Sequence, residues 1–181
     1  MGKILSIAVP AYNVEKYLER CLQSLEVEEL LKKLEVLIIN DGSVDATPEI
    51  AKRYCEKYPQ TYFLYNKENG GHGSGINYGI QKATGKYFKV LDGDDWLNTK
   101  ELPEFLRLLE DSDADIVAAD FLCVEDETDR ILQEKYCTRN EGQYASLCEL
   151  SKGEVDEVIK MHALTIRTSI LKEDRKSTRL N

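Results

Sequence analysis

The fold is decided by the stretch Tyr87-Phe88-Lys89-Val90-Leu91-Asp92-Gly93-Asp94-Asp95-Trp96. Its first five residues are mostly apolar and have the length of one buried strand, with Gly85 before them and Gly93 after them. Three acidic residues then follow within four positions. A buried strand that ends in carboxylates places them at the carboxyl edge of a sheet, where open α/β folds bind their ligands. The stretch therefore predicts an α/β fold with a polar site at one edge of its sheet.

The acidic residues have two interpretations. Asp92 and Asp94 flank a glycine and can turn toward one point, and carboxylate oxygens of this kind suit Mg²⁺ or Mn²⁺, which in turn hold substrate phosphates. Aspartate and glycine are also ordinary turn residues, so the same stretch can be a solvated turn. Taken alone, these residues leave both interpretations open.

The length and the net charge of the chain limit the kinds of molecule that it is expected to bind. The chain has 181 residues, so we expect one domain with a sizeable core. Its formal charge of −9 argues against nucleic acid or an anionic membrane as the main partner. The charge does not argue against a phosphorylated substrate, because a bound divalent cation inverts the local field.

Targeting signals and cysteine usage indicate the cellular compartment in which the protein is expected. No segment has the pattern of a signal peptide, and no apolar run approaches the length of a membrane span. The cysteines are odd in number and contain no Cys-x-x-Cys pair, which favours reduced, mostly buried thiols. They are Cys21, Cys55, Cys123, Cys137 and Cys148. We therefore expect a protein of the cytoplasm or of the inner face of the membrane, with no membrane span in this chain.

Strands and helices alternate along the first half of the chain. Short apolar runs predict strands at residues 4–9, 34–39, 62–65 and 87–91. Between them, apolar residues at helical spacing predict three helices. We expect Pro10 to close the first strand, Asn13 to cap the first helix and Thr47 to cap the second. With right-handed crossovers, the polar loops after all four strands meet at one edge of a mostly parallel sheet.

The second half gives a coarser prediction. Apolar spacing predicts a helix at residues 102–109. Three more strands are expected, at Ile116–Val124, Ile131–Tyr136 (an antiparallel partner) and Ala163–Ile170. The short runs Leu147–Leu150 and Glu157–Ile159 stay unassigned. The last ten residues, Lys172–Asn181, are polar without periodicity and are expected to be a frayed or foreign tail.

Four blocks of loop residues resemble the family 2 glycosyltransferases of the GT-A fold. They are Val9-Pro10-Ala11-Tyr12-Asn13, residues 38–45, residues 69–80 and Leu91-Asp92-Gly93-Asp94-Asp95. A lone D-x-D motif would be weak, but the four blocks match in order and in spacing over residues 4–97. The resemblance implies a GT-A-like, Rossmann-related three-layer α/β/α sandwich with a mostly parallel central sheet. It also implies metal-dependent, inverting transfer of a sugar from a UDP-sugar to a hydroxyl of a glycan, lipid or cell-wall acceptor.

The resemblance assigns roles to residues in these blocks. Tyr12 and Asp41 would contact the base and ribose of the nucleotide sugar, and Asp92 would hold the ribose. Asp94 would ligate Mg²⁺ or Mn²⁺ at the diphosphate, with Asp92 and Asp95 as secondary ligands. A cation held by carboxylates neutralises the charge that grows on a departing nucleoside diphosphate. The implied donor-binding residues are Pro10, Tyr12, Asn13, Asp41, Ser43, Gly71, His72, Asn77, Asp92 and Gly93.

Two departures from the family pattern limit the prediction. The third block of the family often carries an arginine just before the asparagine, where this chain has Ile76 before Asn77. His72 could partly replace that arginine, or it could be a simple loop residue. The family's general base lies in a later Glu-Asp pair, and Glu173-Asp174 is better explained as solvated charge near a loose end. The catalytic base is therefore unassigned, and the chain is expected to be truncated at its C-terminus.

These observations divide the chain into three parts. Residues 1–120 would form the donor-binding half, residues 121–171 the start of an incomplete acceptor half, and residues 172–181 the tail. The alternative to an active transferase is a catalytically silent fragment that binds nucleotide sugar. A nucleotidyltransferase or a dehydrogenase would need a glycine-rich loop after the first strand, and Pro10 to Asn13 is not one. The sugar, the acceptor and any homo-oligomer stay open.

Overall fold

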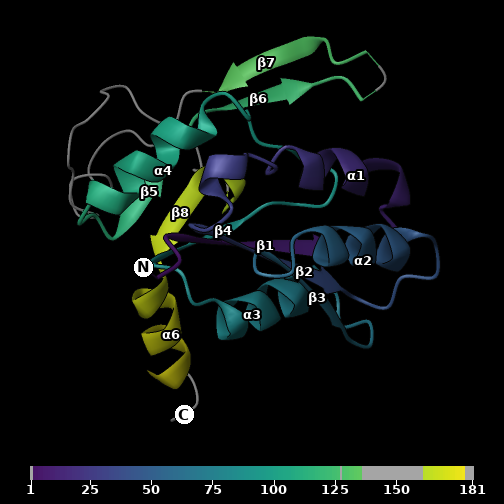
Figure 1. Ribbon diagram of the computed structural model, residues 1–181, viewed down its shortest axis with the longest axis horizontal. Coiled ribbons are helices and arrows are strands. Elements are labelled where there is room, and N and C mark those ends of the chain that lie inside the picture. Colours follow the sequence, from purple (N-terminus) through teal and green to yellow (C-terminus); the bar gives the residue numbers. More distant parts are fainter. Residues whose placement is uncertain (1, 127, 136–160, 178–181) are drawn as a thin grey trace.

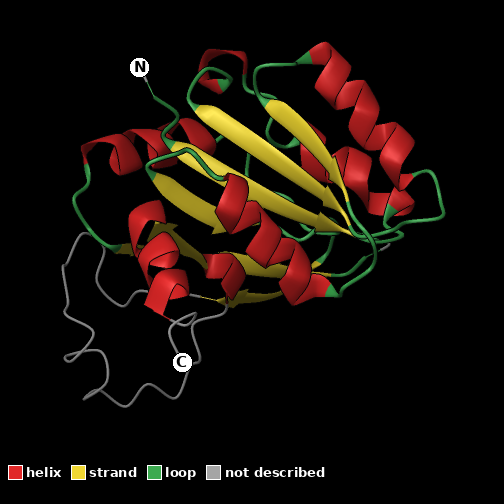
Figure 2. Cartoon of the chain, turned by 90° about the horizontal axis from the view of Figure 1, so that it is seen from below, coloured by secondary structure: helices red, strands yellow, loops and turns green. Residues whose placement is uncertain are grey.

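The computed structural model describes residues 2–126, 128–135 and 161–177. Its centre is a six-stranded sheet in the order β3-β2-β1-β4-β8-β5, with helices on both faces (Figures 1 and 2). The strands are β1 (Leu5–Ala11), β2 (Leu34–Asn40), β3 (Tyr62–Asn66), β4 (Tyr87–Val90), β5 (Ile116–Ala118) and β8 (Leu164–Arg167). Strands β1 to β4 are parallel, and β8 is antiparallel to β4 and β5. The predicted three-layer α/β/α sandwich with a mostly parallel sheet is confirmed.

The helices and a hairpin complete the fold. The helices are α1 (Glu15–Gln23), α2 (Thr47–Lys57), α3 (His72–Lys82), α4 (Leu102–Asp111) and α6 (Thr168–Ser177), with short turns η1 (Glu28–Leu30) and η2 (Met161–Ala163). Strands β6 (Phe121–Val124) and β7 (Ile131–Lys135) form a separate antiparallel hairpin (Figure 1). Within the described residues, no helix combines the length and the hydropathy that a membrane span needs.

A hydrophobic core lies on each face of the sheet. Helices α1, α2 and α4 cover one face through residues such as Leu18, Ile50 and Leu106. Helices α3 and α6 cover the other face, where Ile80 and Leu171 pack. Because both faces are covered, β1 and β2 are buried along their whole length. This explains why their sequences are nearly continuous apolar runs rather than alternating ones.

Helix α3 approaches β1 closely at Gly79. A Cβ atom on Gly79 would lie 2.6 Å from the Cβ of Ala8, well inside normal contact distance. Nearer the start of α3, a Cβ on Gly75 would lie 3.4 Å from the Cβ of Pro10. Glycines along this side of α3 therefore let the helix lie directly on β1 and begin at the carboxyl edge of the sheet.

The prediction that Pro10 closes the first strand is wrong. Strand β1 continues to Ala11, and the carbonyl of Ala8 accepts a hydrogen bond of 3.0 Å from the N–H of Leu91. Pro10 lies two residues after Ala8, so its nitrogen faces the same neighbouring strand. That strand, β4, ends at Val90, so the missing N–H of Pro10 falls beyond the paired region. The proline therefore removes no hydrogen bond from the sheet.

The second half of the chain differs from the prediction in two places. The single strand expected at residues 116–124 is two strands, because the chain leaves the main sheet at the exposed Asp120. Strand β5 stays in the main sheet, whereas β6 pairs with β7, the predicted antiparallel partner. The strand expected at 163–170 ends at Arg167, where α6 begins.

Residues 172–177 belong to α6, although the sequence suggested an irregular tail there. The helix docks on α3 through Leu171, and the Nζ of Lys172 donates a hydrogen bond of 2.7 Å to the carbonyl of Ala83. Tertiary packing of this kind stabilises a helix that has little local signal. The runs Leu147–Leu150 and Glu157–Ile159 lie outside the described residues. The division of the chain at residues 120 and 171 stays a prediction.

Candidate functional site

The loops after the first four strands meet at the carboxyl edge of the sheet, and Asp41 anchors one group of them. Asp41 follows β2 directly and is only 4% exposed. Its carboxylate accepts hydrogen bonds from the backbone N–H groups of Gly70 (3.0 Å) and Gly71 (2.8 Å). It also forms an ion pair with the ammonium of Lys67. The buried carboxylate therefore fixes the position of the glycine-rich loop that precedes α3.

These contacts also set the charge of Asp41. Burial by itself would raise the pKa of the Asp41 carboxyl, but the hydrogen bonds from Lys67, Gly70 and Gly71 outweigh it and lower the pKa. Asp41 is therefore ionised at neutral pH. Because the Lys67 side chain is itself 18% exposed, the ion pair is partly shielded from water.

The glycine-rich loop reaches the acidic stretch through His72. The Nε2 of His72, the first residue of α3, lies 2.6 Å from the Oδ1 of Asp92, which follows β4. Gly71 before it has a φ of 81°, a conformation that favours glycine. A continuous series of contacts thus runs from Asp41 through Gly71 and His72 to Asp92. These four residues, which the sequence assigned to one site, lie together in the structure.

The loops after β1 and β2 hold each other at the same edge. The N–H of Asn13 donates to the Oγ of Ser43 (3.1 Å), and the Oδ1 of Asn13 accepts from the N–H of Val44 (2.9 Å). Asn13 has a φ of 52° and does not cap α1, so that prediction is wrong. Val14 occupies the capping position, and its N–H donates to the Oγ1 of Thr47 (2.9 Å). Thr47, predicted to cap α2, instead serves the start of α1.

Acidic side chains add a second pair of contacts between these loops. The Oε2 of Glu15 accepts from the N–H of Ala46 (2.8 Å), and the Oδ2 of Asp45 accepts from the N–H of Glu15 (3.1 Å). The Oδ1 of Asp45 accepts from the N–H of Thr47 (3.0 Å). Burial alone would raise the pKa of Asp45, but these hydrogen bonds lower it. Each helix start thus receives at least one hydrogen bond from a side chain of the other loop.

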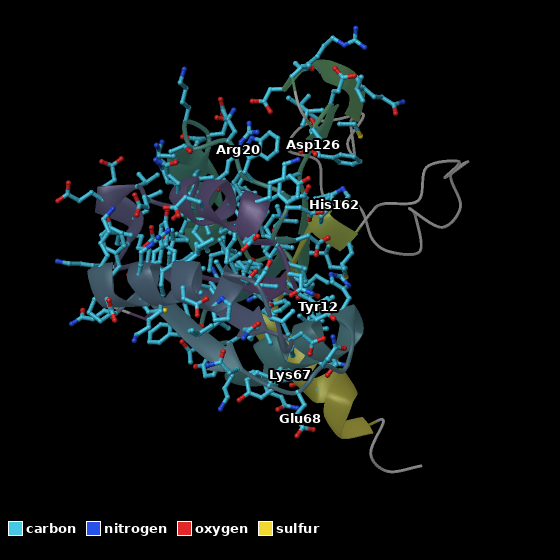
Figure 3. The ribbon with its side chains drawn as sticks, turned by 90° about the vertical axis from the view of Figure 1, so that its right-hand side faces the viewer. Tyr12, Arg20, Lys67, Glu68, Asp126 and His162 are labelled. Carbon is cyan, nitrogen blue, oxygen red and sulfur yellow. The ribbon has the colours of Figure 1, made fainter. Side chains whose placement is uncertain are left out.

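Tyr12 stands at the open side of this edge. The backbone N–H of Asp41 donates to the carbonyl of Ala11 (2.9 Å), so Tyr12 follows directly beside Asp41. The residue is 52% exposed, which is high for a tyrosine next to a buried strand end. Figure 3 shows Tyr12 on the same face of the molecule as Lys67 and His162. An exposed ring beside a buried carboxylate suits a flat, polar-edged ligand.

Gly93 packs the acidic stretch against the end of β1. A Cβ on Gly93 would lie 3.0 Å from the Cγ2 of Val14 and 3.2 Å from the carbonyl oxygen of Pro10. Pro10 and Gly93, both implied by the sequence, are therefore close to each other. Asn77 lies within α3, farther from this edge than His72, the first residue of that helix.

Carboxylates crowd together in the acidic stretch. Burial raises the pKa of Asp95, and the neighbouring Asp94 and Asp92 raise it further, while His162 and Lys89 act in the opposite direction. Burial followed by the same acids also raises the pKa of the thiol of Cys21, which lies beneath the stretch. The local field is therefore negative and favours a cation.

The acidic stretch has the carboxylate oxygens that Mg²⁺ and Mn²⁺ prefer. In the part of the chain that the structure describes, no three His, Cys, Asp or Glu side chains are arranged to hold a metal by themselves. Mg²⁺ at nucleotide sites takes one or two carboxylates and obtains its other ligands from phosphates and water. The stretch holds three carboxylates, on Asp92, Asp94 and Asp95, so one or two of them are available for such a cation.

Three residues near the site were not predicted from the sequence. Lys67 pairs with Asp41, and the Nζ of Lys89 donates to the carbonyl of His162 on η2. A lysine inside a buried apolar run was a signal that could have identified Lys89, which is 4% exposed. Lys67 lies two residues before the glycine-rich block, but nothing local marks it as a partner of Asp41. His162 comes from a distant segment, and no sequence signal pointed to it.

Comparison with known proteins identifies the family of this chain. The family model for glycosyl transferase family 2 matches residues 6–173. The chain belongs to this family. Its relatives include the minor teichoic acid biosynthesis protein GgaB of Bacillus subtilis, with 32% identity over 126 residues, which is 68% of this chain and 14% of GgaB. This chain spans well under half the length of the curated relatives that it matches.

Solved structures share the family 2 fold. S. aureus TarS in complex with UDP-GlcNAc aligns with a TM-score of 0.70 at 22% identity, covering 95% of this chain and 47% of the TarS chain. The mannosyltransferase PcManGT of Pyrobaculum calidifontis, in complex with GDP-Man and Mn²⁺, aligns with a TM-score of 0.56 at 27% identity, over 65% of this chain and 35% of PcManGT.

Proposed function

We propose that this chain is the donor-binding part of a glycosyltransferase that moves a sugar from a UDP-sugar to a hydroxyl group with inversion of configuration. The observation that carries the proposal is the series of contacts from Asp41 through Gly71 and His72 to Asp92. It sets an exposed aromatic ring, a buried carboxylate and an acidic stretch along one edge of the sheet. The base, the ribose and the diphosphate of a nucleotide need three such surfaces one after another.

The chain's own residues would act by binding and orienting the donor. Tyr12 would lie against the base, Asp41 would bind the edge of the base, and Asp92, held by His72, would bind the ribose. Asp94 would hold Mg²⁺ or Mn²⁺, with Asp92 and Asp95 as secondary ligands. When bound, the cation neutralises the charge of the leaving diphosphate as a Lewis acid. The relative PcManGT was solved with Mn²⁺, which supports this choice of metal.

A catalytic base is not assigned to this chain. The backbone of Glu173 lies in α6, next to Lys172, whose Nζ bonds the carbonyl of Ala83 at the end of α3 opposite to His72. Helix α6, which carries Glu173, therefore lies at the other end of α3 from the site (Figure 1). This favours its interpretation as a surface charge. The second candidate function, a catalytically silent domain that binds nucleotide sugars, rests on this observation.

The proposed acceptor and location rest on two separate observations. A glycan, lipid or cell-wall acceptor is proposed because GgaB is named for teichoic acid biosynthesis. We propose that the reaction takes place in the cytoplasm or at the inner face of the membrane. The described thiols of Cys21, Cys55 and Cys123 are free, as such a setting favours.

Titration of UDP by calorimetry, with and without MnCl₂, tests the binding half of this proposal. Because the acidic stretch needs a cation to accept a diphosphate, we expect Mn²⁺ to tighten UDP binding about tenfold or more. Asp94→Ala is expected to remove that gain. Asp111→Ala, at the exposed end of α4, is the matched control and should retain it.

Three results separate the possible outcomes. If UDP binds equally well without the metal, or if Asp94→Ala behaves like Asp111→Ala, the proposed function is wrong. Release of UDP from UDP-sugars above a metal-free control would instead refute the silent-domain alternative. That measurement uses the same protein and the same Mn²⁺ conditions.

A further inference from the structure

Lys89 is a buried lysine in the strand that leads to the acidic stretch. It lies inside β4 between Phe88 and Val90 and is only 4% exposed. Its neighbours across the sheet are Ile7 on β1 and Thr165 on β8, and both are completely buried. Taking an ammonium group out of water is costly unless opposite charge or hydrogen-bond acceptors surround it. Packing alone therefore does not explain why a lysine occupies this position.

The ammonium group of Lys89 extends toward the acidic stretch. Strand β8 is antiparallel to β4 and places Thr165 opposite Lys89. The residues before β8, in η2, therefore lie beside the end of β4, where Asp92 follows. The Nζ of Lys89 donates a hydrogen bond to the carbonyl of His162 in η2. The positive charge thus lies inside the sheet, near the point where the acidic stretch begins.

The acidic stretch has an outer and an inner acid. The N–H of Asp95 donates to the carbonyl of Asp92 (2.9 Å), so the stretch forms a turn at the end of β4. Asp94 is exposed, whereas Asp92 and Asp95 are half-buried. Burial, followed by Asp94 and Asp92, raises the pKa of Asp95, and the charges of His162 and Lys89 oppose this increase. Lys89 therefore acts on the inner acid of the stretch.

On the basis of the proposed function, we propose that Lys89 is a positioning residue of the cation site, whose buried charge makes the site accept the cation together with the diphosphate rather than alone. The ammonium group repels a free divalent cation and attracts the phosphates of the donor. It also stabilises the ionised form of Asp95 beneath the exposed Asp94. The site therefore binds free Mn²⁺ weakly, and the diphosphate brings the cation with it.

Screening by water distinguishes Lys89 from Arg20, a second cation near the stretch. Arg20 lies over the ring of Trp96, but it is exposed and paired with Asp129. Water and this carboxylate screen its charge, so it acts weakly over a distance. The charge of Lys89 is screened much less, because the residue is buried. The complex of Mn²⁺ with UDP has a net negative charge, so Lys89 attracts the complex although it repels the free ion.

Two titrations with expected changes of opposite sign test this inference. Mn²⁺ binding without nucleotide is measured by electron paramagnetic resonance, which counts the free ion, and UDP binding without metal is measured by calorimetry. In Lys89→Met, which keeps the length of the side chain but removes its charge, we expect Mn²⁺ to bind about tenfold more tightly and UDP about fivefold more weakly. A general loss of structure would weaken both.

A second variant and a control separate the charge of Lys89 from its hydrogen bond. Lys89→Gln keeps a donor for the carbonyl of His162 but has no charge, so it should give the same two changes as Lys89→Met. Lys52→Met removes a 72% exposed lysine on α2 and is the matched control for net charge. Both of its dissociation constants should stay within about twofold of those of the unmodified protein.

Each outcome has one meaning. Weaker binding of both ligands by the Lys89 variants, or no change in either, overturns the inference, because Lys89 would then only support the fold. Circular dichroism checks that the variants are folded, and failure of both to fold likewise overturns it. If the unmodified protein binds neither Mn²⁺ nor UDP, together or separately, the proposed function itself fails. If it binds UDP with Mn²⁺ but the Lys89 variants show no opposite shifts, only this inference fails.

Discussion

Replacing Asp41 by asparagine tests whether one carboxylate holds the glycine-rich loop in place. Asparagine has the same shape, but it keeps one carbonyl oxygen and turns an NH₂ group toward the donors of Gly70 and Gly71. It also leaves the ammonium of Lys67 without its counter-charge. Hydrogen bonds to a charged group each contribute about 1.5–3 kcal/mol, and about half of this network survives. We therefore expect the free energy of unfolding to fall by about 2–4 kcal/mol.

The assay is thermal and urea unfolding at several pH values. For a domain of this size, each kcal/mol lowers the Tm by about 2–4 °C, so Asp41→Asn should lower it by about 5–15 °C at pH 7. The pKa of Asp41 is lowered on folding, so its stabilising effect is fully present above the unfolded value of about 3.9. It is lost as the pH falls through the folded pKa. The gap between the two proteins should therefore be constant from pH 7 to about pH 5 and narrow below about pH 4.

Asp111→Asn is the control for this experiment, since Asp111 lies exposed at the end of α4. A surface change of this kind should alter the free energy of unfolding by no more than about 0.5 kcal/mol. A destabilisation by Asp41→Asn below that value would refute the reasoning. So would a loss that stays equally large at pH 3, because it could not then come from the charge of Asp41.

Two further predictions concern packing away from the site. Gly79→Ala would place a methyl group 2.6 Å from the Cβ of Ala8 and should lower the urea-unfolding free energy by about 1–3 kcal/mol; adding Ala8→Gly should restore part of the loss, and a neutral single variant would contradict the packing described. Arg20 joins Asp129 by two hydrogen bonds (2.6 and 3.0 Å) and lies 3.3 Å above the ring centre of Trp96. Arg20→Ala should change global stability by only about 1 kcal/mol, because the pair is exposed, but it should speed amide hydrogen exchange in the β6–β7 hairpin. Unchanged exchange in the hairpin would show that Arg20 does not hold it.

Much of the first half of the fold could be predicted because its strands are buried on both faces. Runs such as Leu34–Asn40 have few alternatives to a central strand, and glycine and acidic residues mark where they end. The role of Pro10 could not be predicted in the same way. It depends on where β4 ends relative to β1, which is a property of the assembled sheet.

The second half was harder because its elements depend on contacts between distant segments. Helix α6 is stabilised by docking on α3 through Leu171 and Lys172, which its own spacing does not reveal. The break at Asp120 separates strands that belong to two different sheets. Sequence reasoning sees a single apolar run there, because periodicity carries no information about the pairing partner.

The residues of the candidate site also fall into two groups, those marked by local motifs and those positioned by contacts between distant segments. Asp41, Gly71, His72 and Asp92 could be assigned from local motifs, and the structure brings them together. The partner of Asp41 could not be assigned, because the 26 residues that separate Lys67 from it are closed only by the pairing of β2 with β3. Asn13 was misassigned for a related reason. Its side chain serves the loop of the next helix rather than its own.

The exchange of hydrogen bonds between the loops after β1 and β2 has a consequence for folding. Neither helix start has all its hydrogen-bond partners until the other loop has arrived, since the N–H of Val14 bonds Thr47 and the N–H of Ala46 bonds Glu15. The first two strand–helix units should therefore form in one cooperative step rather than in succession. A peptide that ends before residue 40 would lack half of the partners its first helix uses. Mixed with a peptide that supplies residues 41–57, it should gain helical structure that neither has alone.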